Sequence, residues 1–256
     1  MPIRTTAILN LKGGVAKTTT AINMAAILSR KHGKRVLLID ADSQCNTTEF
    51  FVKEQWSFNL ASLLRVAAKE DMPREDLPDY IHSTGWRNID IIPGDDSLMD
   101  LDLSKVEQKS VNAGILRTLL DSVGFLYDYC IIDCPPAFNA ACAAALVAAD
   151  DVIIPIKLDA FALRGMANLM RQVENMRRIN PRLRVAGVLP TMWYRAPETE
   201  DAVSQLQTAG FRIFPRIRRS DKVDRMTFAQ DPLMVCSPNS AAGVDYKKFV
   251  DEYKKG

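Results

Sequence analysis

The sequence predicts an α/β fold in which a doubly wound, mostly parallel sheet carries helices on both faces. Apolar strand candidates recur along the 256 residues with helical stretches between them, and this alternation is typical of βαβ units. Some candidates, such as residues 36–39, are apolar without interruption, which suits strands that are buried on both faces. The sequence contains no internal repeat and no low-complexity linker, so we expect a single domain over residues 1–256.

The expected elements follow one another in a regular order. Short apolar runs predict strands at residues 5–9, 35–39, 89–92, 129–132, 152–155 and 185–189, with residues 212–214 as a further candidate. Stretches of helical character between them predict helices at residues 19–32, 114–123, 140–149, 164–179 and 198–209. Residues 70–78 are charged and contain proline, so we expect a surface loop or a short irregular connection there.

The last segment, residues 245–255, is amphipathic. Tyr246, Phe249, Val250 and Tyr253 share one face of the expected helix. A helix that anchors a protein to a membrane would look similar in outline, but here the apolar face is short and two acids interrupt the basic face. We therefore expect this helix to pack on the protein's own core.

Composition sets broad limits on function. Hydrophobic residues make up 47% and charged residues 25% of the chain, as in an ordinary soluble globular protein. The formal net charge of +2 gives no argument for a nucleic-acid partner. The five cysteines are an odd number without C-x-x-C pairing, which argues against a disulfide framework or a zinc site. The sequence has no signal-peptide pattern and no apolar stretch of membrane-spanning length, so we expect a cytoplasmic protein.

A glycine-rich turn joins the first expected strand to the first expected helix. Gly13 and Gly14 permit backbone conformations that a Cβ would block, and they let N–H groups approach a ligand closely. The helix that follows points its unpaired N–H groups and the positive end of its dipole at the same place. Lys17 adds a positive charge and Thr18 a hydroxyl suited to Mg²⁺. The turn therefore predicts a polyphosphate site, with an ordinary strand–helix turn as the alternative.

The strict phosphate-loop pattern G-x-x-x-x-G-K-[ST] is not met, because Leu11 and Ala16 stand where its glycines should be. Residues 12–18, Lys-Gly-Gly-Val-Ala-Lys-Thr, instead resemble the deviant Walker A motif of the ParA/MinD family of P-loop ATPases. The resemblance implies a P-loop NTPase domain that binds ATP through Lys12, Gly13, Gly14, Val15, Ala16, Lys17, Thr18 and Thr19. It also implies that Lys12 is the family's signature lysine, which reaches across a dimer interface to the ATP of the partner subunit.

Acidic residues follow two of the expected strands at their carboxyl ends, where sheets of this kind bind ligands. Asp133 comes directly after the apolar residues 130–132 and has the physical form of a Walker B acid, which holds Mg²⁺. A helix N-cap is the alternative, but Pro135 and Pro136 make immediate entry into a helix less simple. The two prolines also match the family's Asp-x-Pro-Pro.

Asp40 and Asp42 resemble the family's second acidic motif, usually Asp-x-Asp-Pro-Gln-Gly, with Ser43 and Cys45 in place of the proline and the glycine. The resemblance gives Asp40 the role of orienting the attacking water and supporting Mg²⁺. The implied catalytic residues are Lys12, Lys17, Asp40 and Asp133, and the implied metal ligands are Thr18, Asp40 and Asp133. The two substitutions put the conformation of this loop in question, and Asp42 has the alternative of being a turn residue.

The last third of the chain matches the family more loosely. Residues 188–194 resemble the segment beside the base, which implies that Thr191 and Met192 contact adenine. A methionine packs softly against flat ligands, but Met192 and Trp193 have the alternative of being core residues. Residues 213–220 and 231–233 also follow the family pattern.

Two basic clusters stand out. The first holds Arg171, Arg177, Arg178, Arg182 and Arg184, and the second holds Arg212, Arg216, Arg218, Arg219, Lys222 and Arg225. Phosphate contacts give DNA affinity that is independent of sequence. The family's nonspecific DNA binding favours the second cluster, so the implied DNA-binding residues are Arg216, Arg218, Arg219, Lys222 and Arg225. A solvated helix face is the alternative. The chain begins almost at the glycine-rich turn, so we expect no N-terminal helix-turn-helix domain and no operator recognition.

The resemblance implies an ATPase that partitions DNA, with ATP and Mg²⁺ as cofactors. ATP would join two subunits in a sandwich homodimer that binds nonspecific DNA, which places it on the nucleoid, and a ParB-like partner would stimulate hydrolysis. Three alternatives remain. They are a MinD-like positioning ATPase that acts on membranes, an iron–sulfur reductase ATPase related to the nitrogenase iron protein, and a nucleotide-gated scaffold that barely hydrolyses ATP.

Overall fold

The computed structural model describes residues 3–54, 56–69, 73–159 and 162–256. Its centre is a seven-stranded sheet in the order β3-β4-β2-β5-β1-β6-β7. The strands are β1 (Arg4–Ile8), β2 (Val36–Asp40), β3 (His82–Ser83), β4 (Ile89–Ile92), β5 (Tyr129–Asp133), β6 (Asp151–Lys157) and β7 (Arg184–Thr191). The short β3 pairs with β4 in antiparallel fashion, and the other neighbours pair in parallel. This sheet confirms the predicted fold class.

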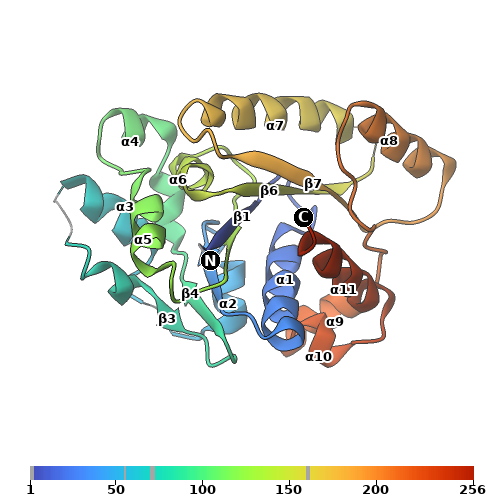
Figure 1. The fold of residues 1–256 in the computed structure, drawn as a ribbon, viewed down its shortest axis with the longest axis horizontal. Coiled ribbons are helices and arrows are strands. Elements are labelled where there is room, and N and C mark those ends of the chain that lie inside the picture. The colour runs from blue at the N-terminus through green and yellow to red at the C-terminus, as the bar shows by residue number, and fades with distance from the viewer. Residues whose placement is uncertain (1–2, 55, 70–72, 160–161) are drawn as a thin grey trace.

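Helices cover both faces of the sheet (Figure 1). They are α1 (Lys17–His32), α2 (Asn46–Phe51), α3 (Leu60–Lys69), α4 (Leu103–Glu107), α5 (Ile115–Val123), α6 (Ala140–Ala148), α7 (Ala162–Arg177), α8 (Pro197–Thr208), α9 (Lys222–Ala229), α10 (Leu233–Cys236) and α11 (Ala241–Tyr253), with 3₁₀ turns η1 (Leu77–Tyr80) and η2 (Asp96–Asp100). Side chains of a strand alternate between the two faces. Leu37 thus packs in the core under α5, α6 and α7, whereas Leu38 packs in the core under α1 and α11.

Two expected elements differ from the structure. Residues 212–214 form a single bridge, Val188 to Ile213, rather than a strand, because Pro215 follows and has no N–H with which to extend a ladder. The loop expected over residues 70–78 is interrupted by η1 at its end, while residues 70–72 lie outside the described residues. None of the helices within the described ranges is long and apolar enough to cross a membrane.

The C-terminal helix α11 packs beside α1, as Figure 1 shows. It begins at Ala241, four residues earlier than expected, because the side chain of Ser240 caps it by accepting from the N–H of Gly243. Tyr246, Phe249, Val250 and Tyr253 are all buried. The expectation that this helix packs on the protein's own core is therefore confirmed.

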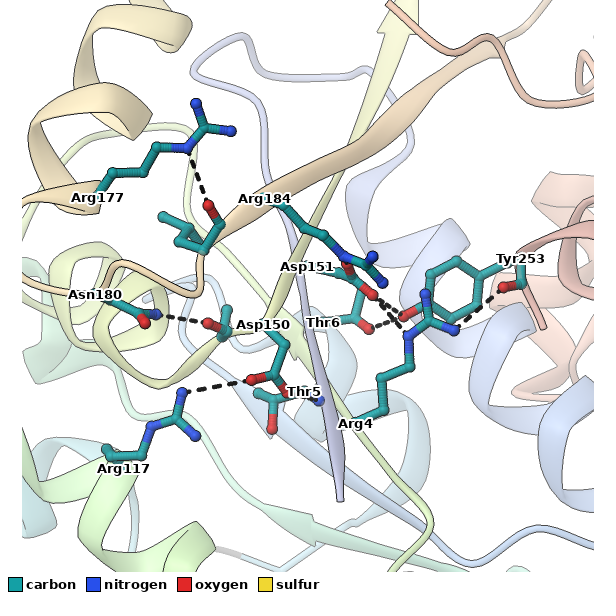
Figure 2. A network of polar contacts seen from close by, with 12 residues as sticks. Arg4, Thr5, Thr6, Arg117, Asp150, Asp151, Arg177, Asn180, Arg184 and Tyr253 are labelled. Carbon is teal, nitrogen blue, oxygen red and sulfur yellow. Dashed lines mark hydrogen bonds and ion pairs between the residues drawn. The ribbon is translucent and has the colours of Figure 1, made fainter. Parts of the chain in front are cut away.

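A buried ion-pair network ties α11 to the amino ends of the strands (Figure 2). Asp151, which is fully buried, accepts hydrogen bonds from Arg4 Nε at 2.7 Å, Arg184 Nε at 2.6 Å and Tyr253 Oη at 3.0 Å. Burial opposes the charge of this carboxylate, but the hydrogen bonds from Arg184 and Arg4 outweigh burial and hold the pKa of Asp151 below its usual value. Arg184 of the first basic cluster thus has an internal partner.

Candidate active site

The glycine-rich loop connects β1 to α1 and contains two residues in the left-handed region. Gly14 has φ +68° and Ala16 has φ +67°. Glycine adopts this conformation readily, whereas alanine does so at a cost. Ala16 stands where the strict motif has glycine, and its left-handed backbone is one that a glycine would adopt at lower cost. Open space surrounds the positions that a Cβ would take at Gly13 and Gly14, which leaves room for a ligand.

Lys17 begins α1 with its side chain in the interior of the site. The residue is 7% exposed, and its Nζ lies 3.2 Å from the backbone oxygen of Lys12. Burial lowers the pKa of Lys17, and the charges of Asp133 and Asp42 oppose this effect. The charges of these carboxylates keep the Lys17 ammonium protonated against burial, and a buried cation of this kind attracts an anion.

Asp133 ends β5 and is buried. Its Oδ2 accepts hydrogen bonds from Thr18 Oγ1 and Thr47 Oγ1, each at 2.7 Å. Its Oδ1 is buried and has no hydrogen-bond partner among the residues that the structure describes. Burial raises the pKa of Asp133 to about 6, although the hydrogen bonds from Thr18 and Thr47 oppose the rise.

This donor set fits Mg²⁺. The ion takes hydroxyl and carboxylate oxygens as ligands and keeps waters and phosphate oxygens in its remaining positions. The unpaired Asp133 Oδ1 is a buried oxygen that lacks a partner within the described ranges, and the Thr18 hydroxyl lies on the other oxygen of the same carboxylate. Thr18 and Asp133, with Asp40 on the adjacent strand, are the residues that would hold the ion.

Asp40 ends β2 and is fully buried. Its Oδ2 accepts from both the N–H and the Oγ1 of Thr48, each at 2.8 Å, and its Oδ1 accepts from the N–H of Asp42 at 3.2 Å. Burial, followed by the charge of Asp133, raises the pKa of Asp40 to about 7. Asp42 lines the neighbouring cavity and also accepts from the N–H of Gln44, so it is a turn residue as well as a site residue.

The loop after Asp40 has a left-handed backbone at one of its two substituted positions. Cys45, where the family has glycine, has φ +52° and precedes the first residue of α2. The left-handed backbone at this position is the reason that glycine suits it. Cys45 therefore stores some strain, and α2 still begins at Asn46.

A cavity of about 650 Å³ opens above these residues. Its lining includes residues from the glycine-rich loop, from the acidic loop, from the end of β7 and from the segment before α9. Of the predicted site residues it contains Gly13, Gly14, Ala16, Lys17, Thr18, Thr19, Thr191, Met192, Arg218 and Arg219. Val15 is buried, and its carbonyl accepts from Thr191 Oγ1 at 3.0 Å. Lys12 is exposed and donates from Nζ to Asp159.

Members of the second basic cluster already have internal partners. Arg216 pairs with Glu200 at 2.7 Å and lies over the Trp193 ring. Arg218 donates to both oxygens of Asp245, at 2.7 and 2.9 Å, and Lys222 pairs with Asp221 at 3.0 Å. Arg218 and Arg219 also line the cavity. DNA contact by this cluster stays a prediction, because two of its members, Arg218 and Arg219, face the cavity.

Two residues that donate to the carboxylates, Thr47 and Thr48, were missed in the sequence, as was a third, Gly94, that donates to Thr48. Thr47 and Thr48 form the first turn of α2, and Gly94 follows β4. Two adjacent threonines directly after the acidic motif were the available signal, because short hydroxyl side chains near a carboxylate donate hydrogen bonds to it. Gly94 gave no signal of its own in the sequence.

Comparisons with known proteins identify a family and several relatives. Residues 3–185 match a protein family described as an AAA domain. The chain is 34% identical over 261 residues to the chromosome partitioning protein ParA of Caulobacter vibrioides strain NA1000 / CB15N, with 98% of this chain and 94% of that protein covered.

Solved structures share the fold. A complex of ATP with an aspartate-to-alanine variant of Cyanothece McdA has a TM-score of 0.82 and 25% identity, with 99% and 95% of the two chains covered. MinD of Pyrococcus horikoshii OT3, complexed with Mg-ADP, has a TM-score of 0.77 and 21% identity, with 99% and 96% covered. The second of these likenesses concerns the fold alone.

Proposed function

The chain belongs to the ParA/MinD family of P-loop ATPases, and on that premise we propose that it hydrolyses ATP to drive the partitioning of DNA. The observation that carries the proposal is the buried pair Asp40 and Asp133 beside the glycine-rich loop. A relative of nearly the same length is named as a chromosome partitioning protein, which favours DNA as the cargo.

The proposed mechanism assigns each group a simple task. N–H groups of the glycine-rich loop and the ammonium of Lys17 bind the phosphates of ATP at the start of α1. Mg²⁺, when bound, supplies positive charge that neutralises the phosphate oxygens. Asp40 orients the attacking water, and Thr191 and Met192 border the base. Hydrolysis of this kind needs little beyond positioning and charge neutralisation.

Lys12 is proposed to act across a homodimer. Its side chain is exposed and pairs with Asp159 at the surface, while its backbone oxygen faces the ammonium of Lys17. The side chain of Lys12 thus lies at the surface and is engaged with Asp159. An ATP-bound partner that packs against this surface would receive the ammonium group of Lys12.

The remaining parts of the proposal concern DNA and a partner protein. A dimer doubles any weak basic surface, and two linked weak sites bind with higher avidity than one. DNA binding would therefore require ATP, and a ParB-like partner would stimulate hydrolysis and release the DNA. Membrane binding through α11 is disfavoured, because Tyr246, Phe249 and Tyr253 on its apolar face are buried in the core.

A DNA shift assay tests the proposal. The protein is incubated with ATP, ADP or no nucleotide and with two DNA duplexes of unrelated sequence, and vesicles of anionic lipid replace DNA in a parallel sedimentation. We expect the protein to bind DNA only when ATP is present and with equal affinity for the two duplexes. We expect no sedimentation of the protein with lipid vesicles. ATP-dependent lipid binding without DNA binding would instead support the MinD-like alternative.

A further inference from the structure

One side chain outside the predicted site joins Asp40 to a distant loop. The Thr48 hydroxyl donates to Asp40 Oδ2 at 2.8 Å and accepts from the N–H of Gly94 at 2.8 Å. The N–H of Thr48 donates to the same Asp40 oxygen, also at 2.8 Å. A hydroxyl has one donor and two acceptor lone pairs, so the Thr48 hydroxyl gives its single donor to the carboxylate and accepts from the loop.

Gly94 also lies close to the same carboxylate. A Cβ at Gly94 would lie 3.2 Å from Cγ of Asp40, 3.0 Å from its backbone oxygen and 3.2 Å from the backbone oxygen of Asp42. These contacts are tighter than ordinary van der Waals packing, so a side chain at position 94 would push Asp40 or the loop away. The absence of a side chain at position 94 thus has a steric reason in the placement of Asp40.

These contacts of Thr48 and Gly94, which together form the seat of the Asp40 carboxylate, are needed for a conformational reason. The terminal torsion of an aspartate is broad and roughly two-fold, so its carboxylate turns unless hydrogen bonds fix it. In Asp40 the two donors from Thr48 fix Oδ2, whereas Oδ1 has one longer bond of 3.2 Å from the N–H of Asp42. The less engaged Oδ1 is the oxygen left to act on a further group.

Thr48 itself is held in place by α2. Phe50 and Phe51 of this short helix are buried in the core under α1. The carbonyl of Glu49 accepts from Gln230 Nε2 at 2.8 Å, which ties α2 to the end of α9. The seat is thus built on packed elements and joins three segments of the chain that meet only in the fold.

We propose that Thr48 and Gly94 are positioning residues that hold the Asp40 carboxylate in the orientation required for ATP hydrolysis. Neither residue lines the nucleotide cavity, so both act through Asp40. Their roles rest on the proposed function of Asp40. The structure separates them from Thr47, whose hydroxyl donates to Asp133 instead.

The test compares Thr48→Val, Thr48→Ser and Gly94→Ala with Asp40→Ala. Thr48→Val keeps the shape of the side chain and removes its hydroxyl, whereas Thr48→Ser keeps the hydroxyl. Thr84→Val is the matched control, because Thr84 is also 8% exposed and its hydroxyl also donates to an oxygen, that of Ile89, and accepts from a backbone N–H, that of Trp86. Single-turnover hydrolysis of ATP with Mg²⁺ and ATP affinity by calorimetry are measured for each variant.

We expect Thr48→Val and Gly94→Ala to lower the hydrolysis rate by about 10- to 100-fold, the range for a misplaced catalytic group, with unchanged ATP affinity. Thr48→Ser should restore the rate, and Thr84→Val should match the wild type. If Thr48→Val does not fold, Gly94→Ala decides the question alone, since it removes no hydrogen-bonding group.

Three outcomes would overturn the proposal in different ways. Normal turnover in Asp40→Ala would remove the proposed role of Asp40 and the seat together. Abolished turnover in Asp40→Ala, combined with a normal rate in Gly94→Ala and Thr48→Val, would remove the seat alone and leave the proposed function standing. A fall in ATP affinity in parallel with the rate would also reject a positioning role.

Discussion

Asp40 and Asp133 are register partners at the carboxyl ends of the adjacent parallel strands β2 and β5, and both are buried. Two carboxylates in such a place repel one another, and burial raises the pKa of each. The positive charge of Lys17 opposes this rise at Asp133. The sheet therefore assembles a site with carboxylates on one side and the N–H groups of a glycine-rich loop on the other, which suits a polyphosphate carrying Mg²⁺.

Lys17→Ala should lower ATP affinity by about 100-fold, because the phosphates lose a hydrogen bond from a charged donor in a partly desolvated site. Isothermal titration calorimetry with ATP and Mg²⁺ measures the change. Lys34→Ala is the control, since Lys34 pairs with Asp128 at the other end of the sheet. Equal affinities for the wild type and Lys17→Ala would contradict the assigned role.

Lys12→Ala should separate nucleotide binding from assembly. The Lys12 side chain is at the surface, so we expect ATP affinity to be kept and the ATP-dependent dimer to be absent in light scattering. Lys31→Ala removes a similarly exposed lysine that pairs with Asp251 and should dimerise normally. A full ATP-dependent dimer in Lys12→Ala would reject the signature-lysine assignment.

Ala16→Gly should stabilise the protein. The alanine has φ +67° and ψ +36°, and a left-handed alanine costs about 1 kcal/mol more than a glycine there. We expect a gain of about that size in chemical denaturation. Ala167→Gly is the control of opposite sign, because Ala167 is an exposed residue within α7, where glycine costs about 1 kcal/mol. A destabilised Ala16→Gly would show that the loop is not strained at this position.

Much of the fold was open to prediction, because apolar runs mark six of the strands and the carboxyl ends of parallel strands meet at one edge. Helices α2, α3, α4, α9 and α10 were not predicted from the sequence. Of these, α2, α4 and α10 have six, five and four residues, too few to show helical periodicity, whereas α3 and α9 have ten and eight residues and were overlooked. The contact of Thr48 with Gly94 joins residues 46 positions apart, so only the folded chain reveals it. Arg218 likewise looked free in the sequence, since its partner Asp245 lies 27 residues away.

Asp151→Ala should destabilise the protein by about 3 kcal/mol, at the lower end for a broken buried ion pair because Arg184 is largely in solvent. The pKa of Asp151 is lowered in the folded state, so its stabilising effect is complete above the unfolded pKa of about 4 and is lost as pH falls through the lower, folded pKa. Urea unfolding of the wild type and of Asp151→Ala should therefore show a difference in the free energy of unfolding at neutral pH that disappears in acid. Glu174→Ala, which breaks the exposed pair with Arg177, should cost less than about 1 kcal/mol. A difference in stability that persists in acid would show that Asp151→Ala acts through packing instead.

Either of the two basic clusters has the charge to contact DNA, and substitutions can distinguish them. Arg218 is bound to Asp245 and lines the cavity with Arg219, so changing either would disturb the nucleotide as well. Lys222→Glu with Arg225→Glu changes the second cluster on α9, and Arg171→Glu with Arg178→Glu makes the same change of charge at α7 in the first cluster.

If the second cluster binds DNA, the α9 double variant should bind DNA more weakly than the wild type in the presence of ATP, with unchanged ATP affinity and an unchanged dimer, and the α7 variant should bind DNA normally. A salt series counts the phosphates that the protein neutralises, because the slope of log affinity against log salt becomes shallower by about 0.9 for each phosphate that is no longer neutralised. The opposite pattern would move the DNA surface to α7. Normal binding by both variants would leave neither cluster with a role in DNA binding, since counterion release cannot be carried by charges whose reversal has no effect.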